Sequence, residues 1–162
     1  MDKSESQTSL EPFILFEIAG TAYAVRSCDV QEMEMIEHIT PVPNAPPYVE
    51  GVVFLRGKVI PVVNLRLRFG MEKVPFNMQT RLVVVHHQER TIGLIVDTCR
   101  RFTRIPTERI QPPPDVISES TKHYLQGFVM LDEKPVLVLD IGAVVDTTQI
   151  PQCEKSNSAQ QT

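Results

Sequence analysis

The feature that most constrains the fold is an eighteen-residue segment that occurs twice in the chain. Residues 48–65 have the sequence YVEGVVFLRGKVIPVVNL, and residues 124–141 have the sequence YLQGFVMLDEKPVLVLDI. Aligned without gaps, the copies are identical at Tyr48/Tyr124, Gly51/Gly127, Val53/Val129, Leu55/Leu131, Lys58/Lys134 and Val62/Val138. Most other core positions are apolar in both copies. The repeat therefore indicates an internal duplication of one structural unit.

Each copy predicts a β-hairpin. In the first copy, two apolar runs flank Arg56 and Gly57, and the glycine can supply the positive φ of a tight turn. The second copy carries Asp132 and Glu133 at the same turn. Because a hairpin of this shape folds without the arginine, Arg56 is free to serve a partner.

Further strands repeat around these hairpins. Residues 13–25 predict a first hairpin, residues 81–96 predict one that resembles it, and residues 99–105 take the place of the alternating run 32–36. Each half thus supplies about five short strands, the number at which a small sheet can close on itself. The predicted fold class is all-β with a few short helices, arranged as two intertwined small five-stranded β-barrels.

The same patterns predict the organisation of the chain. We expect one domain over residues 12–149, with barrel halves at roughly 12–77 and 78–146 that exchange some segments. Residues 1–11 are polar and acidic and are expected to be a flexible N-terminus. Residues 150–162 are poor in apolar side chains and are expected to be a disordered C-terminal tail.

Charge and composition exclude several function classes. The net charge is −4 in 162 residues, and no basic run interleaved with aromatic residues could follow a phosphate backbone, so nucleic-acid binding is not expected. No apolar segment reaches membrane-spanning length and the N-terminus has no leader pattern, which predicts a cytoplasmic protein without membrane insertion. The three cysteines, Cys28, Cys99 and Cys153, show no CxxC spacing and suit a reducing compartment.

Catalytic and metal-binding patterns are missing from the sequence. The candidate carboxylates are scattered over turns and strand ends, the adjacent His86 and His87 point to opposite faces of a predicted strand, and no phosphate-binding glycine loop or GxSxG motif occurs. The dispersed carboxylates are Asp97, Asp115, Asp132 and Asp140. We therefore expect no enzyme activity, no cofactor and no metal.

The first repeat resembles the CheW family. Residues 51–66, GVVFLRGKVIPVVNLR, follow the family pattern G-V-x-N-L-R-G-x-x-x-P-V-x-D-L-R, and the similarity extends over roughly residues 13–145. The resemblance implies two five-stranded barrels and a non-catalytic adaptor in cytoplasmic arrays beneath the membrane. Its implied partners are a CheA-type histidine kinase and the cytoplasmic tip of methyl-accepting chemoreceptors. No receiver domain follows and no kinase segment precedes, so the chain resembles a stand-alone member.

The resemblance also implies protein-binding residues. Arg56 and Gly57 match the coupling turn of the family, and Val30, Glu32 and Gly51 match neighbouring positions implicated in partner binding. Asp115 and Val116 match the place where the second barrel contacts the kinase. The chain departs from the family at Phe54, where Asn is usual, at Asn64, where Asp is usual, and at Glu34, where some relatives are basic; these changes bear on the identity of the partner.

Structural alternatives stay open for several of these residues. Arg56 could be an exposed turn residue held by a local carboxylate, and Glu32 could be only the polar side of a strand. Val30, Met33 and Met35 are more often core than contact residues, although methionine suits adaptable binding surfaces. Alternative functions are an adaptor of a pilus- or gliding-type chemosensory pathway, a small-ligand or peptide sensor that uses the cleft between the barrels, and a hydrolase with dispersed carboxylates.

Overall fold

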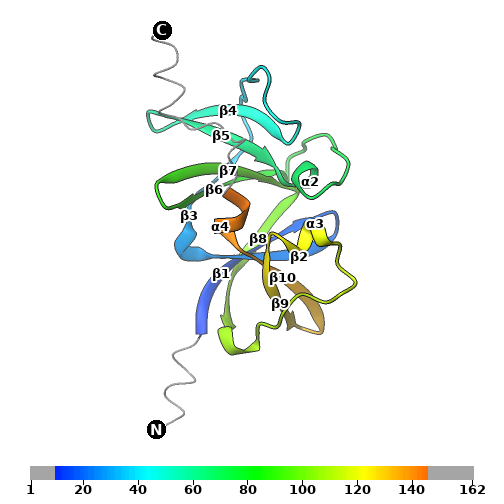
Figure 1. Ribbon diagram of the computed structural model, residues 1–162. Helices are drawn as coiled ribbons and strands as arrows, with labels where there is room; N and C mark the ends of the chain where they lie inside the picture. The colour runs from blue at the N-terminus through cyan, green and yellow to red at the C-terminus, as the bar shows by residue number, and fades with distance from the viewer. Residues whose placement is uncertain (1–9, 146–162) are drawn as a thin grey trace.

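The computed structural model describes residues 10–145 and shows a mainly β fold with short helical turns (Figure 1). The strands are β1 (Leu10–Ile18), β2 (Thr21–Arg26), β3 (Val30–Met35), β4 (Val49–Leu55), β5 (Lys58–Asn64), β6 (Arg81–His87), β7 (Arg90–Val96), β8 (Thr98–Pro106), β9 (Leu125–Leu131) and β10 (Lys134–Leu139). The helical turns are η1 (Ser27–Asp29), α2 (Leu65–Arg68), η2 (Thr107–Arg109), α3 (Glu119–Lys122) and α4 (Ile141–Val145). The predicted C-terminal tail lies outside the described residues, as does most of the predicted flexible N-terminus. Leu10 and Glu11, the last residues of that N-terminus, belong to β1.

The strands form two five-stranded sheets, which confirms the predicted fold class. One sheet has the order β8-β1-β2-β10-β9, and the other has the order β3-β6-β7-β5-β4. In Figure 1 the second sheet lies above the first, with α4 between them. The boundary expected near residue 77 falls between β5 and β6, inside the second sheet. Each sheet combines segments from both expected halves. β1 pairs with β8 and β2 with β10, while β3, β4 and β5 share a sheet with β6 and β7.

Neither sheet closes into a barrel through a continuous ladder. Between the end strands β3 and β4, the chain makes one isolated bridge, Thr40 to Val52. The other sheet has the equivalent bridge, Gln111 to Phe128. The predicted barrels are therefore sheets whose edges meet at a single residue pair each, so part of each edge stays open.

A glycine occupies each of these meeting points. A Cβ atom at Gly51 would overlap the carbonyl oxygen of Thr40, and a Cβ at Gly127 would overlap that of Gln111. Gly51 also has a φ of +147°, which L side chains rarely adopt. Both repeats therefore have a glycine at this position for a packing reason: the backbone at Thr40 crosses directly over Gly51, and the backbone at Gln111 crosses directly over Gly127.

The main core joins the two sheets. Its buried side chains come from both sheets and from α2 and α4, and smaller apolar clusters fill each sheet separately. Within the main core, an aromatic row runs from Phe16 through Tyr23 and Phe69 to Tyr124, with ring centroids 5.5–5.8 Å apart. Stacked aromatic contacts of this kind stabilise a shared interface, so the two halves form one body.

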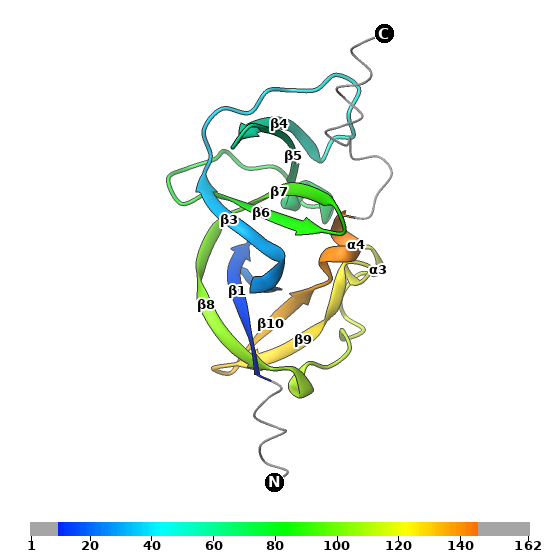
Figure 2. The same cartoon turned by 90° about the vertical axis from the view of Figure 1, so that its left-hand side faces the viewer.

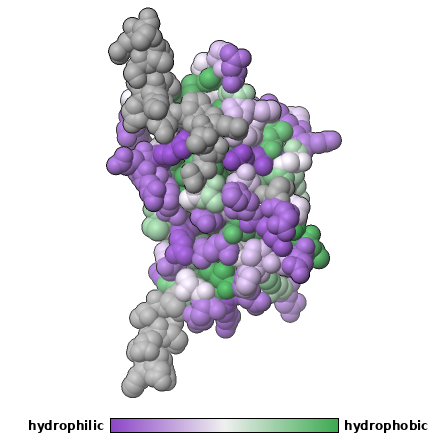
Figure 3. Space-filling model, viewed as in Figure 1, coloured by the Kyte–Doolittle hydropathy of each residue, from purple (hydrophilic) through white to green (hydrophobic). Residues whose placement is uncertain are grey.

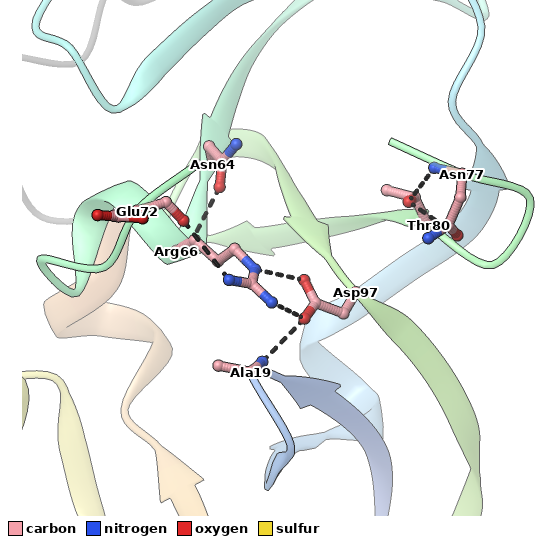
Figure 4. A network of polar contacts seen from close by, with 7 residues as sticks. All are labelled: Ala19, Asn64, Arg66, Glu72, Asn77, Thr80 and Asp97. Carbon is pink, nitrogen blue, oxygen red and sulfur yellow. Dashed lines mark hydrogen bonds and ion pairs between the residues drawn. The ribbon is translucent and has the colours of Figure 1, made fainter. Parts of the chain in front are cut away.

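A polar clamp also connects the sheets (Figure 4). Arg66, in α2, donates from Nε to Oδ1 of Asp97 at 2.9 Å and from Nη2 to Oδ2 at 2.6 Å. The backbone N–H of Ala19, in the turn between β1 and β2, donates to Oδ2 of Asp97 at 2.8 Å. Burial alone would raise the pKa of the Asp97 carboxyl, but the hydrogen bonds from Arg66 and Ala19 outweigh burial and lower it.

Candidate functional site

The turn between β4 and β5 presents Arg56 to solvent. Arg56 and Gly57 both have positive φ, +50° and +79°, as the central residues of a type I′ hairpin turn require. The other hairpin has the same geometry at Asp132 and Glu133, with φ of +52° and +66°. The predicted turn is therefore confirmed. A glycine at the second position eases it but is not needed to form it.

Arg56 makes a forked ion pair with Glu32 of β3. Its Nε lies 3.1 Å from both carboxylate oxygens, and its Nη2 lies 2.9 Å from Oε1. The Arg56 side chain is 76% exposed, whereas that of Glu32 is 16% exposed. A local carboxylate therefore does hold Arg56, as one of the two interpretations of this residue predicted. Among residues 10–145, however, Nη1 has no hydrogen-bond partner, so part of the guanidinium stays available.

Two carboxyl groups, those of Glu32 and Glu34, lie near the single guanidinium of Arg56. The hydrogen bond from Arg56 lowers the pKa of Glu32 and raises the pKa of Arg56. Glu34, two residues further along β3, has a raised pKa because it shares a hydrogen bond with the Glu32 carboxyl and is repelled by it. Two carboxyl groups thus compete for one guanidinium, and Glu32 holds it.

Two of the expected binding residues have structural contacts. Gly51 is buried beneath Thr40, and Val30 is half-buried and packs against the main core. Both lie in the same sheet as Arg56 and Glu32. They therefore support the position of β3 and β4 rather than offering large side chains to a partner.

Asp115 and Val116 lie elsewhere, in the segment that leads into α3 and β9. Val116 is 90% exposed, and the Asp115 carboxylate, also fully exposed, lies 3.5 Å from Nζ of Lys122. The structure thus does not join these two residues to the Arg56 turn. They form a separate exposed feature beside the sheet of β1, β2, β8, β9 and β10.

The sequence reasoning missed an apolar groove between β3 and β8. Met33 and Met35, expected more often as core, are 47% and 51% exposed, and Phe102 of β8 is 55% exposed. The Sγ of Cys99 lies 3.1 Å from the Sδ of Met33, which brings these end strands of the two sheets together (Figure 2). A hollow of about 240 Å³ lies here, lined by Ile14, Met33, Met35, Arg81, Cys99, Arg100 and Phe102.

A signal for this groove was present in the repeat. Met33 and Phe102 occupy equivalent positions when residues 22–36 are aligned with residues 91–105. Alternation alone placed the methionines inside, because it assumes a strand with one buried face. β3 is an end strand, and its methionine side lies outside the core. On the face shown in Figure 3, by contrast, hydrophilic side chains dominate and hydrophobic ones form small separate patches.

The described part of the chain contains neither a metal-ion cluster of His, Cys, Asp and Glu side chains nor a membrane-spanning helix. Residues 10–145 contain no group of three or more His, Cys, Asp or Glu side chains that could hold a metal ion. A membrane crossing would need a longer and more apolar helix than any within these residues. The fold and the exposed features together define a duplicated two-sheet module with an exposed arginine turn and an exposed apolar groove.

Comparisons with known proteins agree with this class. The model of the CheW-like domain matches residues 12–149. Chemotaxis protein CheW of Helicobacter pylori is 35% identical over 143 residues, which cover 88% of this chain and 86% of that protein. Chemotaxis protein CheW of Klebsiella aerogenes is 25% identical over 150 residues, covering 93% and 90%. The crystal structure of the scaffolding protein TtCheW from Thermoanaerobacter tengcongensis superposes with a TM-score of 0.77 at 28% identity, covering 86% and 90%.

The chain belongs to the CheW-like domain family. It is accordingly a non-catalytic scaffold of the chemotaxis type. The resemblance in the Arg56 turn extends to the whole described fold.

Proposed function

We propose that this protein couples chemoreceptors to a CheA-type histidine kinase, as an adaptor in cytoplasmic arrays at the membrane. The observation that carries the proposal is the Arg56 turn of a CheW-like chain: an exposed guanidinium is held in place by Glu32 and keeps Nη1 available. A planar guanidinium suits carboxylate or backbone oxygens of another protein, and arginine is frequent at binding hot spots.

Two exposed features support an adaptor role. One is the Arg56 turn at the tip of β4 and β5, and the other is the groove that contains Met33 and Phe102. An adaptor must hold two partners at once, and separate surfaces allow this. Flexible methionine side chains in the groove suit an adaptable apolar contact. Each contact of this kind buries a modest area, and binding becomes stronger when the contact is repeated in an array.

Asp115 and Val116 provide a third contact in this proposal. Removing an exposed valine side chain from water is favourable, so a partner that covers Val116 would gain binding free energy. We assign these two residues to a second contact with the kinase, made by the sheet that does not carry Arg56.

Reconstitution tests the proposal. The purified chain is mixed with the CheA-type kinase of the same organism and with receptor cytoplasmic fragments on vesicles, and kinase autophosphorylation is measured. We expect receptor-dependent control of the kinase only when the chain is present. Control that is equally strong without the chain, or a chain that binds neither protein, would overturn the proposal.

A further inference from the structure

Three sulfur-containing side chains meet in the groove between β3 and β8 (Figure 2). The Sγ of Cys99 lies 3.1 Å from the Sδ of Met33, and Met35 lines the same hollow of about 240 Å³. The sequence could not predict this cluster, because Cys99 and Met33 are 66 positions apart and belong to different sheets. The fold thus collects soft donor atoms that no sequence motif places together.

The two methionines can both reach the thiol. Met33 and Met35 are two residues apart on β3, so they lie on the same face of the strand, about 7 Å apart. They are 47% and 51% exposed, and methionine has three rotatable bonds, so both sulfur atoms can move. Two metal–sulfur bonds of about 2.3 Å at a trigonal angle place their sulfurs about 4 Å apart. Met33 therefore needs to withdraw from Cys99 by only about 1 Å to admit an ion.

The lining of the hollow selects the class of ion. Among residues 10–145, no carboxylate or imidazole lines it, and no group of three or more His, Cys, Asp or Glu side chains could hold a metal ion. Zinc, calcium and magnesium therefore lack a complete set of ligands here, since they bind thiolate, imidazole or oxygen donors. Thiolate and thioether sulfur together suit Cu(I).

The charges around the hollow favour a monovalent ion. Arg81 and Arg100 line it, and Arg100 is paired with Glu17. Burial raises the pKa of the Cys99 thiol, and the nearby Arg81 lowers it by less, so the thiol carries its proton at neutral pH. When Cu(I) binds, the S–H bond breaks, the S–Cu bond forms and the proton goes to water. This exchange adds no net charge beside the two guanidinium groups, whereas a divalent ion would add one.

The sulfur cluster occurs in only one half of the duplicated fold. When residues 22–36 are aligned with residues 91–105, the positions of Cys99, Met33 and Met35 correspond to Val30, Phe102 and Arg104. None of these three equivalents carries sulfur. The pseudo-symmetric groove therefore offers a single set of sulfur donors, which predicts one ion for each chain.

We propose that Cys99, Met33 and Met35 form a Cu(I) site, in which one thiolate and two thioethers bind the ion. The ion joins β3 of one sheet to β8 of the other through metal–sulfur bonds. This site goes beyond the adaptor role and does not depend on it.

Anaerobic titration of the purified full chain with Cu(I), in competition with the chromophoric chelator bicinchoninate, tests the site. We expect one Cu(I) for each chain, and X-ray absorption should show only sulfur neighbours, at about 2.3 Å. Loss of a supporting partner alone costs about 10–100-fold in metal affinity, so Cys99→Val should weaken binding more than about 100-fold, and Met33→Leu and Met35→Leu about tenfold or more each. Valine replaces Cys99 because the equivalent position of the first half carries Val30.

Matched controls remove sulfur elsewhere in the chain. The double variant Cys28→Ser/Cys153→Ser leaves Cys99 as the only cysteine, and Met130→Leu removes an exposed thioether outside the hollow. Both proteins should bind Cu(I) as the wild type does. Equal binding by Cys99→Val or by the two methionine variants of the site, a comparable loss in the double cysteine variant, or nitrogen and oxygen neighbours around copper would overturn the proposal. Thermal unfolding without copper checks that each variant is folded.

Discussion

Arg56 and Glu32 are joined by a forked ion pair across the open edge of one sheet. Arg56 lies at the tip of the β4–β5 hairpin, and Glu32 lies on β3, so the pair spans 24 positions of the chain. The less exposed carboxylate positions the more exposed guanidinium. A side chain held in this way loses less conformational freedom when it binds a partner, which favours a recognition role.

Replacing Arg56 should leave the fold intact. Exposed ion pairs contribute little to stability, and the Asp132–Glu133 turn shows that the hairpin does not require arginine. We expect Arg56→Ala to keep the melting temperature within about 2 °C of the wild type in differential scanning calorimetry. A larger decrease would mean that the pair with Glu32 is mainly structural.

The two edge glycines should be far more sensitive. Alanine at Gly51 or Gly127 would collide with the carbonyl oxygen of the crossing segment, so we expect each variant to lose about 2 kcal/mol or more of unfolding free energy. Urea denaturation measures the loss. Gly57→Ala is the control because no atom lies near its Cβ position and only the positive φ opposes it. Equal effects at Gly51 and Gly57 would show that the edges do not meet there.

Asn64→Asp tests a departure from the family pattern. The Asn64 amide is 2% exposed and donates to Oε2 of Glu50 at 2.8 Å, and its oxygen caps α2 through the N–H of Arg66. An aspartate keeps the cap but places two carboxylates together, which should cost about 1–3 kcal/mol at neutral pH.

The double variant with Glu50→Gln should restore most of that stability, because glutamine can donate to the new aspartate. Chemical denaturation gives the unfolding free energies of the wild type, both single variants and the double variant, and these four values form a double-mutant cycle. If Asn64→Asp left the unfolding free energy unchanged, the contact between Asn64 and Glu50 would contribute nothing to stability.

The Asp97 clamp predicts a pH dependence. The pKa of Asp97 is lowered in the folded protein, so its contribution is complete above the ordinary pKa of an unfolded aspartate, about 4, and is lost as pH falls through the folded value. Asp97→Asn should lose about 2 kcal/mol at pH 7. The difference between wild type and variant, followed by urea denaturation, should shrink below about pH 4. A difference independent of pH would contradict the clamp.

The sequence predicted the strands and the Arg56 turn because local patterns determine them. The duplication, the apolar runs and the turn residues all act over short distances. The same information could not decide which hairpin pairs with which, since β1–β2 and β6–β7 are similar; the parallel contacts of β2 with β10 and of β7 with β5 settle that only in three dimensions. Which segments the two predicted halves exchange therefore could not be read from the sequence.

The site was predictable only in part for the same reason. Arg56 was recognised because its turn is a local motif, but its pairing with Glu32 depends on how β3 and β4 approach each other. The bearing of Asn64 on the partner stays a prediction, and its structural role could not be read from the sequence: it is buried, donates to Glu50 and caps α2. Met33 was expected in the core, and its exposure follows from the end position of β3.

The most direct test of the adaptor account is receptor control of kinase autophosphorylation in the reconstituted assembly, with Arg56→Ala in place of the wild-type chain. The matched control is Asp132→Ala, at the equivalent turn position of the second hairpin. The account predicts that Arg56→Ala, although folded, loses most receptor control while Asp132→Ala keeps it. Full control of the kinase by the Arg56→Ala protein would contradict the central role of this guanidinium.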